Sequence, residues 1–155
     1  MSEFEPVLND LDNPLVSVLV YNYNYGKYLE DCLESIVAQT YSNIEIIFSD
    51  NASTDHSWQV ALSFLEKYPG RMTITRNRKN MGPTANLQNC HKNARGTYFV
   101  TLGSDDVMLP EYIEQCVNAF SIEPRLGYVM VHCSIMDGES NVREEPPFYN
   151  QTCVI

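Results

Sequence analysis

The sequence predicts an α/β fold: a three-layer, open, mostly parallel and doubly wound sheet with helices on both faces. Short apolar runs typical of strands alternate along the chain with longer segments whose apolar residues recur at helical spacing. Parallel strands need such crossovers, because each connection must return the chain to the same edge of the sheet. Polar residues directly follow three of the apolar runs, where the carboxyl ends of parallel strands form a ligand crevice.

The first half of the chain contains two strand–helix pairs. Residues 1–13 are acidic and carry a proline, so we expect an irregular lead-in. The continuous apolar runs at 15–21 and 44–49 are predicted strands. The segments 27–39 and 57–68 place apolar residues on one helical face, and a Pro-Gly pair ends the second helix.

The second half continues this alternation. A short strand is predicted at 72–75, a helix with a proline in its first turn at 83–93, and a strand buried on both faces at 98–102. A helix at 111–120 and a fifth strand at 127–135 follow, and Asp137-Gly138 is typical of a hairpin turn. The expected organisation is a core at 14–135 and a hairpin or irregular tail at 136–155.

The composition is that of one globular domain of 155 residues, with 44% hydrophobic and 19% charged residues. A formal net charge of −10 argues against binding to nucleic acid or to anionic membranes, because both attract positive proteins. A phosphate ligand would then need a divalent cation as a bridge, since a carboxylate at about 4 Å repels a phosphate oxygen by about 4 kcal/mol.

Of the five cysteines, Cys32 and Cys116 fall on apolar helix faces, which predicts buried thiols in a reducing compartment and no zinc site. The sequence shows no leader and no long apolar run, so we expect a soluble, cytoplasmic chain.

Two adjacent carboxylates, Asp105 and Asp106, follow the predicted strand at 98–102 after a small Gly103-Ser104 pair. Adjacent carboxylates repel each other unless a cation or a set of N–H donors lies between them. Aspartates also suit a turn and the cap of the next helix, so this structural interpretation stays open. The position at a strand end, together with the acidic net charge, favours a metal site.

Polar residues follow the first two predicted strands as well. Asn22, Tyr23 and Asn24 offer a ring for stacking and amides for hydrogen bonds, which suits a planar base and its sugar. Asp50 ends the second strand and can accept a base N–H or a ribose hydroxyl, so we expect its carboxylate to face solvent while the site is empty. The polar residues at 53–55 are equally suited to capping the next helix.

A basic loop follows the third predicted strand and supplies Arg76, Arg78 and Lys79. A diphosphate could use this positive charge, although such a loop can equally be a solvated surface. The motifs of competing nucleotide-binding folds are missing from the sequence. No G-x-G-x-x-G follows the first strand, which argues against dinucleotide binding, and the lack of G-x-x-x-x-G-K-[ST] excludes a phosphate-loop NTPase.

Three stretches occur in a characteristic order and spacing: VSVLVYNYN, then QTYSNIEIIFSDNASTD, then NMGPTANLQNCHKNARGTYFVTLGSDD. Through them, residues 14–135 resemble the family 2 glycosyltransferases of GT-A fold. The resemblance implies a nucleotide-diphosphate sugar donor, most readily a UDP-sugar, with Mn²⁺ or Mg²⁺ as cofactor and inversion at the anomeric carbon. It also implies a saccharide or lipid-linked acceptor, as in polysaccharide biosynthesis, and a cytoplasmic location that includes the inner face of the membrane.

Site residues are carried over from the family by position. The resemblance assigns the nucleotide sugar to Asn22, Tyr23, Asn24, Asp50 and Asp105, and the metal to Asp106 and Asp105. The chain departs from the family pattern where Tyr21-Asn22 replaces a common Pro-Thr, where Asn51-Ala52 replaces an Asp-Gly, where Gly103 stands at the first acidic position, and where Leu87 replaces an arginine.

The leading hypothesis is the donor-binding part of a metal-dependent glycosyltransferase. Members of the family continue into an acceptor half with an acidic catalytic base, and no motif of this sequence identifies such a base. We therefore expect donor binding with negligible transfer, and a tendency to form homodimers through exposed apolar surface. The alternative is a non-catalytic nucleotide-sugar-binding or interaction module. A sugar-phosphate nucleotidyltransferase would need a Gly-rich loop after the first strand, and a receiver domain would need its acidic pair there.

Overall fold

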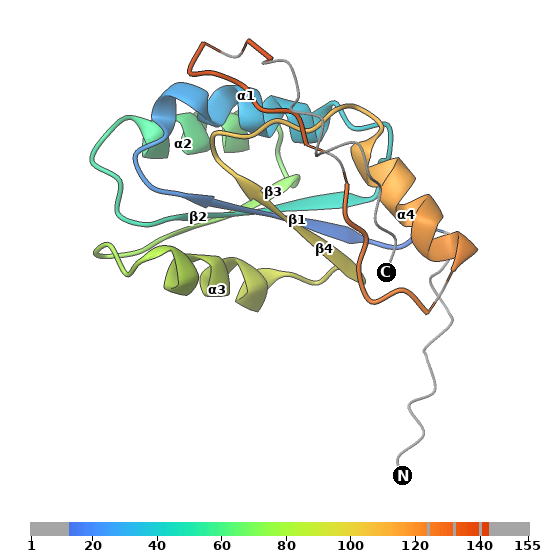
Figure 1. Cartoon of the computed structure of the whole chain (residues 1–155). Coiled ribbons are helices and arrows are strands. Elements are labelled where there is room, and N and C mark those ends of the chain that lie inside the picture. Colours follow the sequence, from blue (N-terminus) through green and yellow to red (C-terminus); the bar gives the residue numbers. More distant parts are fainter. Residues whose placement is uncertain (1–12, 124, 132, 140, 143–155) are drawn as a thin grey trace. The chain divides into compact units, whose positions relative to one another are not determined.

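The computed structural model describes residues 13–123, 125–131, 133–139 and 141–142 (Figure 1). The chain divides into two compact units, Met1–Glu114 and Gln115–Ile155. The predicted lead-in at 1–13 and tail at 136–155 lie mostly outside the described residues, so both stay predictions.

Four parallel strands form the sheet of the first unit, in the order β3-β2-β1-β4. The strands are β1 (Val16–Asn22), β2 (Ile44–Asp50), β3 (Met72–Arg76) and β4 (Tyr98–Gly103). Their bounds confirm the predicted strands to within one residue. The pairing register sets Asn22 beside Asp50 and Tyr21 beside Gly103, so the ends of β1, β2 and β4 meet at one edge of the sheet.

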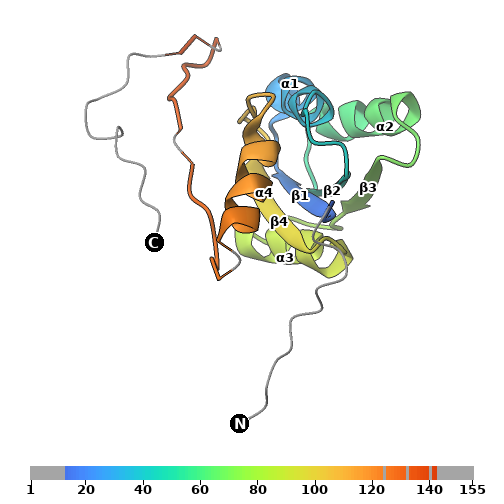
Figure 2. The same cartoon turned by 90° about the vertical axis from the view of Figure 1, so that its right-hand side faces the viewer.

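Helices cover both faces of this sheet. Helices α1 (Gly26–Val37) and α2 (Ser57–Lys67) lie on one face, and α3 (Pro83–Asn93) lies on the other (Figures 1 and 2). The three-layer arrangement and the crossover helices of the doubly wound fold are thereby confirmed. Helix α4 (Tyr112–Ile122) begins in the first unit and continues into the second.

The core of the first unit lies against both faces of β1 and β2. Leu19 of β1 and its register partner Ile47 of β2 are fully buried against Cys90 of α3. On the facing helix, α1 buries Leu29, Leu33 and other apolar residues at helical spacing. These two central strands are therefore the most buried part of the described sheet, and the loops of the site follow their carboxyl ends.

Two of the strand predictions are wrong. The strand predicted to be buried on both faces, β4, lies at the edge of the described sheet, and Phe99 is 60% exposed. The strand predicted at 127–135 is absent from the described residues of that range, where Tyr128 and Met130 are exposed. An apolar run becomes a buried strand only where neighbours cover it, which the run itself does not encode. The hairpin turn at Asp137 is confirmed by an isolated antiparallel bridge between Met136 and Val142.

Candidate functional site

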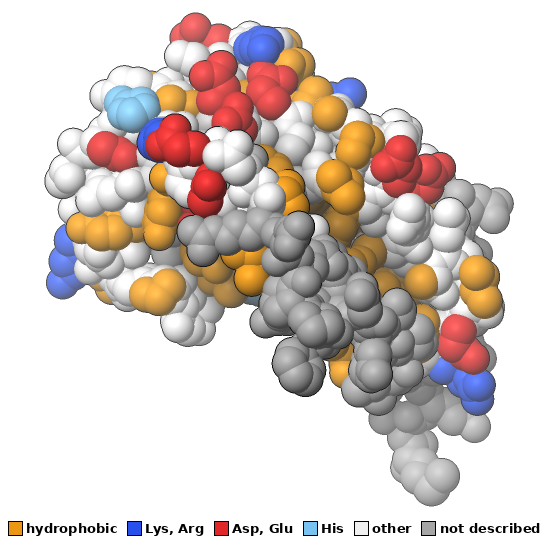
Figure 3. Space-filling view, turned by 45° about the horizontal axis from the view of Figure 1, so that its top comes forward, with side chains coloured by type: hydrophobic (Ala, Val, Ile, Leu, Met, Phe, Trp, Pro, Cys, Tyr) orange, Lys and Arg blue, Asp and Glu red, His pale blue; other side chains and the backbone are white. Residues whose placement is uncertain are grey.

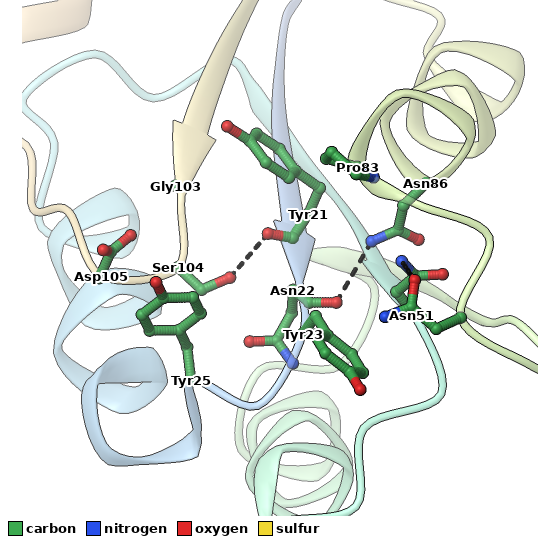
Figure 4. Close-up of a pocket in the computed structure, with 11 residues that line it drawn as sticks. Tyr21, Asn22, Tyr23, Tyr25, Asn51, Pro83, Asn86, Gly103, Ser104 and Asp105 are labelled. Atoms are coloured by element: carbon green, nitrogen blue, oxygen red, sulfur yellow. Dashed lines mark hydrogen bonds between the residues drawn. The ribbon is translucent and has the colours of Figure 1, made fainter.

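A cleft of about 280 Å³ opens at the carboxyl edge of the sheet (Figure 4). Its lining comes from the ends of β1, β2 and β4 and from the first turns of α3. A crevice at this edge is the usual ligand site of an open α/β sheet. The prediction that the polar residues after three strands share one crevice is confirmed in its location.

The two predicted carboxylates converge above Gly103. A Cβ atom at Gly103 would lie 2.8 Å from Oδ2 of Asp106 and 2.9 Å from Oδ1 of Asp105. The backbone turn is fixed by the N–H of Asp106, which donates to the Gly103 carbonyl at 3.1 Å, and by Ser104 Oγ, which donates to the Tyr21 carbonyl at 2.9 Å. Because Gly103 has no side chain, a small space stays open beside it that one carboxylate oxygen of Asp105 and one of Asp106 border; we call this space the cradle.

This cradle suits a divalent cation whose remaining ligands come from a bound phosphate. Burial raises the pKa of Asp106, and the neighbouring charge of Asp105 raises it further. Among the described residues, no group of three or more His, Cys, Asp or Glu side chains could enclose a metal ion. Mg²⁺ and similar ions commonly bind through one or two carboxylates together with substrate phosphates, so the pair fits that kind of site.

The formal net charge of −10 also favours a cation as the partner of a phosphate. On the face shown in Figure 3, acidic side chains cover more of the surface than basic ones. Beneath the acidic pair, the buried Cys32 thiol donates to the Gly103 carbonyl at 3.5 Å. Burial, together with Asp106 and Asp105, raises the pKa of this thiol to about 12, so it stays a neutral thiol and adds no thiolate ligand.

Asp50 does not face solvent, and this part of the prediction is wrong. Its carboxylate is fully buried and accepts hydrogen bonds from Asn22 Nδ2, from both the N–H and the hydroxyl of Ser53, and from Arg76 Nε at 3.0 Å. A carboxylate has about four acceptor sites, and here each is taken by the protein. Asp50 therefore lies under the cleft as a structural acceptor, because the register aligns β1, β2 and β3 around it.

Asn22 lines the cleft, as predicted, but its amide is largely buried. Nδ2 donates to Asp50 Oδ1 at 3.0 Å and to Ser53 Oγ at 3.1 Å. Its backbone carbonyl accepts the N–H of Asn51 at 2.9 Å and Nδ2 of Asn86 at 3.2 Å. Its side-chain oxygen Oδ1 is buried without a hydrogen-bond partner.

Two tyrosine rings lie beside this asparagine. Tyr23 and Tyr25 both line the cleft and are 42% and 43% exposed, and Figure 4 shows the Asn22 amide between them. Asn24, which was assigned to the ligand, is not among the lining residues. Its Oδ1 instead accepts the N–H of Thr54 at 2.8 Å, which joins the loops after β1 and β2.

The predicted basic loop does not bring free positive charge into the cleft. Arg76 is engaged by Asp50, by the Ser53 carbonyl at 2.8 Å and by the ring of Trp58, and neither Arg78 nor Lys79 lines the cleft. The reason is that β3 ends beside β2, where the buried carboxylate draws the guanidinium inward.

A network of asparagines near the cleft was missed. Asn51 Nδ2 donates to Asn80 Oδ1 at 2.8 Å, while Asn77 Nδ2 donates to both Asn51 Oδ1 and Asn86 Oδ1 at 2.9 and 3.1 Å. These bonds hold the loop after β3 against the start of α3, and three of the four side chains line the cleft. The only signal was the density of asparagines between 77 and 93, which does not reveal their partners.

Comparisons with known proteins give one consistent family. The family model described as "Glycosyl transferase family 2" matches residues 17–152. An uncharacterized glycosyltransferase of Nostoc is 32% identical over 130 residues, which cover 84% of this chain and 40% of the relative. Chondroitin synthase of Escherichia coli is 30% identical over 129 residues, covering 83% of this chain and 18% of that protein. The chain thus spans well under half of the length of these relatives.

Solved structures share the fold. The chain superposes on S. aureus TarS 1-349, solved in complex with UDP-GlcNAc, with a TM-score of 0.66 and 24% sequence identity. The match covers 71% of this chain and 32% of TarS 1-349. A mannosyltransferase from Pyrobaculum calidifontis, solved in complex with GDP-Man and Mn²⁺, matches with a TM-score of 0.59 and 26% sequence identity. That match covers 61% of this chain and 28% of the mannosyltransferase. Within the described part of this chain, no helix has the length and apolar character needed to cross a membrane.

Proposed function

The chain belongs to glycosyltransferase family 2, and on this premise we propose that it carries the nucleotide-sugar donor site of a metal-dependent glycosyltransferase. The observation that carries the proposal is the pair of carboxylate oxygens that converge above Gly103 beside an aromatic cleft. A nucleotide-diphosphate sugar presents both parts that this arrangement suits, a planar base and a diphosphate that needs a cation near carboxylates.

In this proposal each part of the cleft has one task. Tyr23 and Tyr25 stack on the base, whose flat face matches an aromatic ring. Asp105 and Asp106 hold Mn²⁺ or Mg²⁺, which when bound offsets the charge of the diphosphate leaving group. The structurally similar mannosyltransferase from Pyrobaculum calidifontis was solved in complex with GDP-Man and Mn²⁺, which supports pairing a nucleotide sugar with a metal ion here.

The transfer itself follows from that donor. An acceptor hydroxyl attacks the anomeric carbon from the face opposite the diphosphate, the sugar–oxygen bond to the diphosphate breaks, and the configuration inverts. A base must take the hydroxyl proton, and we assign none, because this proposal gives both Asp105, which lines the cleft, and its neighbour Asp106 to the cation. The saccharide or lipid-linked acceptor, the cytoplasmic location and the homodimer stay predictions.

Calorimetry of a nucleoside diphosphate with and without Mn²⁺ tests the proposal. We expect measurable UDP or GDP binding only with the metal, and we expect Asp106→Asn to lose most of that gain. Glu66→Gln removes one exposed carboxylate from α2 and serves as the matched control, with unchanged binding. Equal affinity in Mn²⁺ and in chelator would refute the metal site, and no binding of any nucleoside diphosphate would refute the proposed function.

A further inference from the structure

The loop that carries the acidic pair is held at both of its ends. This loop, residues 104–111, forms neither helix nor strand and runs beside α1 on its way from β4 to α4 (Figure 1); we call it the acidic loop. At its start, Ser104 Oγ donates to the Tyr21 carbonyl at 2.9 Å. Near its end, the N–H of Met108 donates to Ser35 Oγ of α1 at 3.1 Å, and the Met108 side chain is buried. The two aspartates therefore lie on a short span between two fixed points.

One buried side chain, Gln39, adds three bonds at the far end of this loop. Gln39 lies two residues after α1 and is 8% exposed. Its Nε2 donates to the Leu109 carbonyl at 2.7 Å and to the Ser35 carbonyl at 3.1 Å, and its Oε1 accepts the N–H of Ile113 at 3.0 Å. The last carbonyls and the first N–H groups of a helix have no partner within it, and Gln39 supplies one to each helix. A single amide thus joins the end of α1, the acidic loop and the start of α4.

The chemistry of this position requires an amide. Gln39 uses both hydrogens of Nε2 as well as its oxygen. A glutamate there would set a carboxylate oxygen against the Leu109 carbonyl, where two acceptors repel each other. A leucine of similar size would leave the N–H of the buried Ile113 unpaired, which is costly. Either exchange would loosen the far end of the acidic loop.

We propose that Gln39 is a positioning residue for the metal site, because it holds the acidic loop in the shape that brings Asp105 and Asp106 to the cradle. This inference rests on the proposed function. The bonds of the Gln39 side chain go to backbone groups and to neither carboxylate, so it acts through the loop. The two carboxylates repel each other, and a loop free to move would separate them. A cation would then bind only those molecules in which the loop has returned to the closed shape.

The size of the effect depends on the fraction of molecules with the closed loop. The apparent Kd of a ligand is its intrinsic Kd divided by that fraction. Gln39→Leu removes the bonds to Leu109 and Ile113, and the loss of two largely buried hydrogen bonds weakens such an equilibrium by about 10- to 100-fold. We therefore expect the apparent Kd of the Mn²⁺–nucleotide complex to rise about 3- to 30-fold in Gln39→Leu. Ser35→Ala, which removes only the acceptor of the Met108 N–H, should have a smaller effect in the same direction.

Calorimetric titration of the 155-residue chain with the Mn²⁺ complex of UDP, or of GDP, measures this Kd, and urea unfolding of each variant measures its stability. The matched control is Ser17→Ala, at the amino end of β1. It removes a buried hydroxyl that donates to Glu45 and accepts the N–H of Gly96, so it should also lower the free energy of unfolding. A purely structural role of Gln39 predicts the same result for both variants. We expect both to lose stability and only Gln39→Leu to lose affinity.

Hydrogen exchange of the wild-type chain tests the inference without any variant. The N–H groups of Met108 and Ile113 should be protected before a ligand is added, because the loop is already held. Rapid exchange at both positions would overturn the proposal.

The outcomes separate this inference from the proposed function. Metal-dependent binding in the wild type, with a change of less than about twofold in Gln39→Leu, would overturn the role of Gln39 and leave the donor site in place. An equal loss of affinity in Ser17→Ala would do the same, because it would trace the effect to general stability. Absence of metal-dependent binding in the wild-type chain would overturn the proposed function and this inference with it.

Discussion

Replacing Asp50 by alanine should destabilise the fold strongly, although the residue sits at the edge of the ligand cleft. The side chain is fully buried and accepts bonds from Asn22, from two groups of Ser53 and from Arg76. Removing one partner of a buried charged pair costs about 3–5 kcal/mol, because the remaining groups are left without compensation. Arg76 is 39% exposed and can regain water, which places the expected loss near the lower bound, at about 3 kcal/mol.

Urea unfolding of the chain measures this loss directly. The control is Asp105→Ala, which removes an exposed carboxylate at the same edge and should change the free energy of unfolding by about 0.5 kcal/mol or less. Relief of repulsion with Asp106 could make that change favourable. A loss below about 1 kcal/mol in Asp50→Ala, equal to that of a simple helix cap, would refute the buried network as described here.

Two further predictions concern the acidic pair and the opposite edge of the sheet. Gly103→Ala should abolish metal-dependent nucleotide binding in calorimetry while the fold persists in circular dichroism, because its Cβ would lie within 3 Å of oxygens of Asp105 and Asp106; unchanged binding would show that the cradle is not the metal site. Burial alone would raise the pKa of Glu45, but the Ser17 hydroxyl and the N–H groups of Arg95 outweigh it and hold that pKa below its usual range. The contribution of Glu45 to the free energy of unfolding should therefore be fully present above about pH 4.5 and should be lost as the pH drops through the folded pKa. Glu45→Gln should flatten this part of a plot of unfolding free energy against pH. An equally steep plot for the variant would contradict the assignment.

The regular elements could be predicted because local signals and tertiary contacts agree there. Helix α3 spans 83–93 as expected, since Pro83 suits its first turn and Gly82 adopts a positive φ of 83° just before it. The centres of β1 and β2 are apolar and buried because helices cover both faces of the sheet there. Phe99 shows the limit of this reasoning. Its run is as apolar as that of a central strand, but β4 lies at the edge of the described sheet.

The site was harder to predict because its chemistry depends on pairings between distant segments. The aspartates and asparagines were found at the right strand ends, since turn and ligand residues gather there. Their partners were not found: Asn77 bonds to Asn51 and to Asn86 across 26 and 9 positions of sequence, and no periodicity encodes such contacts. The sequence shows how many asparagines lie between 77 and 93, but only the structure shows which of them bond to each other.

The position of a strand in the sheet decides whether the aspartate at its end is structural or available to a ligand. Asp50 closes β2, which has a neighbour on each side, and the register places Asn22 and Arg76 next to it as donors. Its charge is satisfied by the fold before any ligand arrives. The acidic pair follows β4, whose one neighbour in the described sheet is β1, and the nearby Tyr21 carbonyl is an acceptor already bonded to Ser104. Adjacent strands offer these carboxylates no such set of donors, which is why the proposed function assigns a cation to them and not to Asp50.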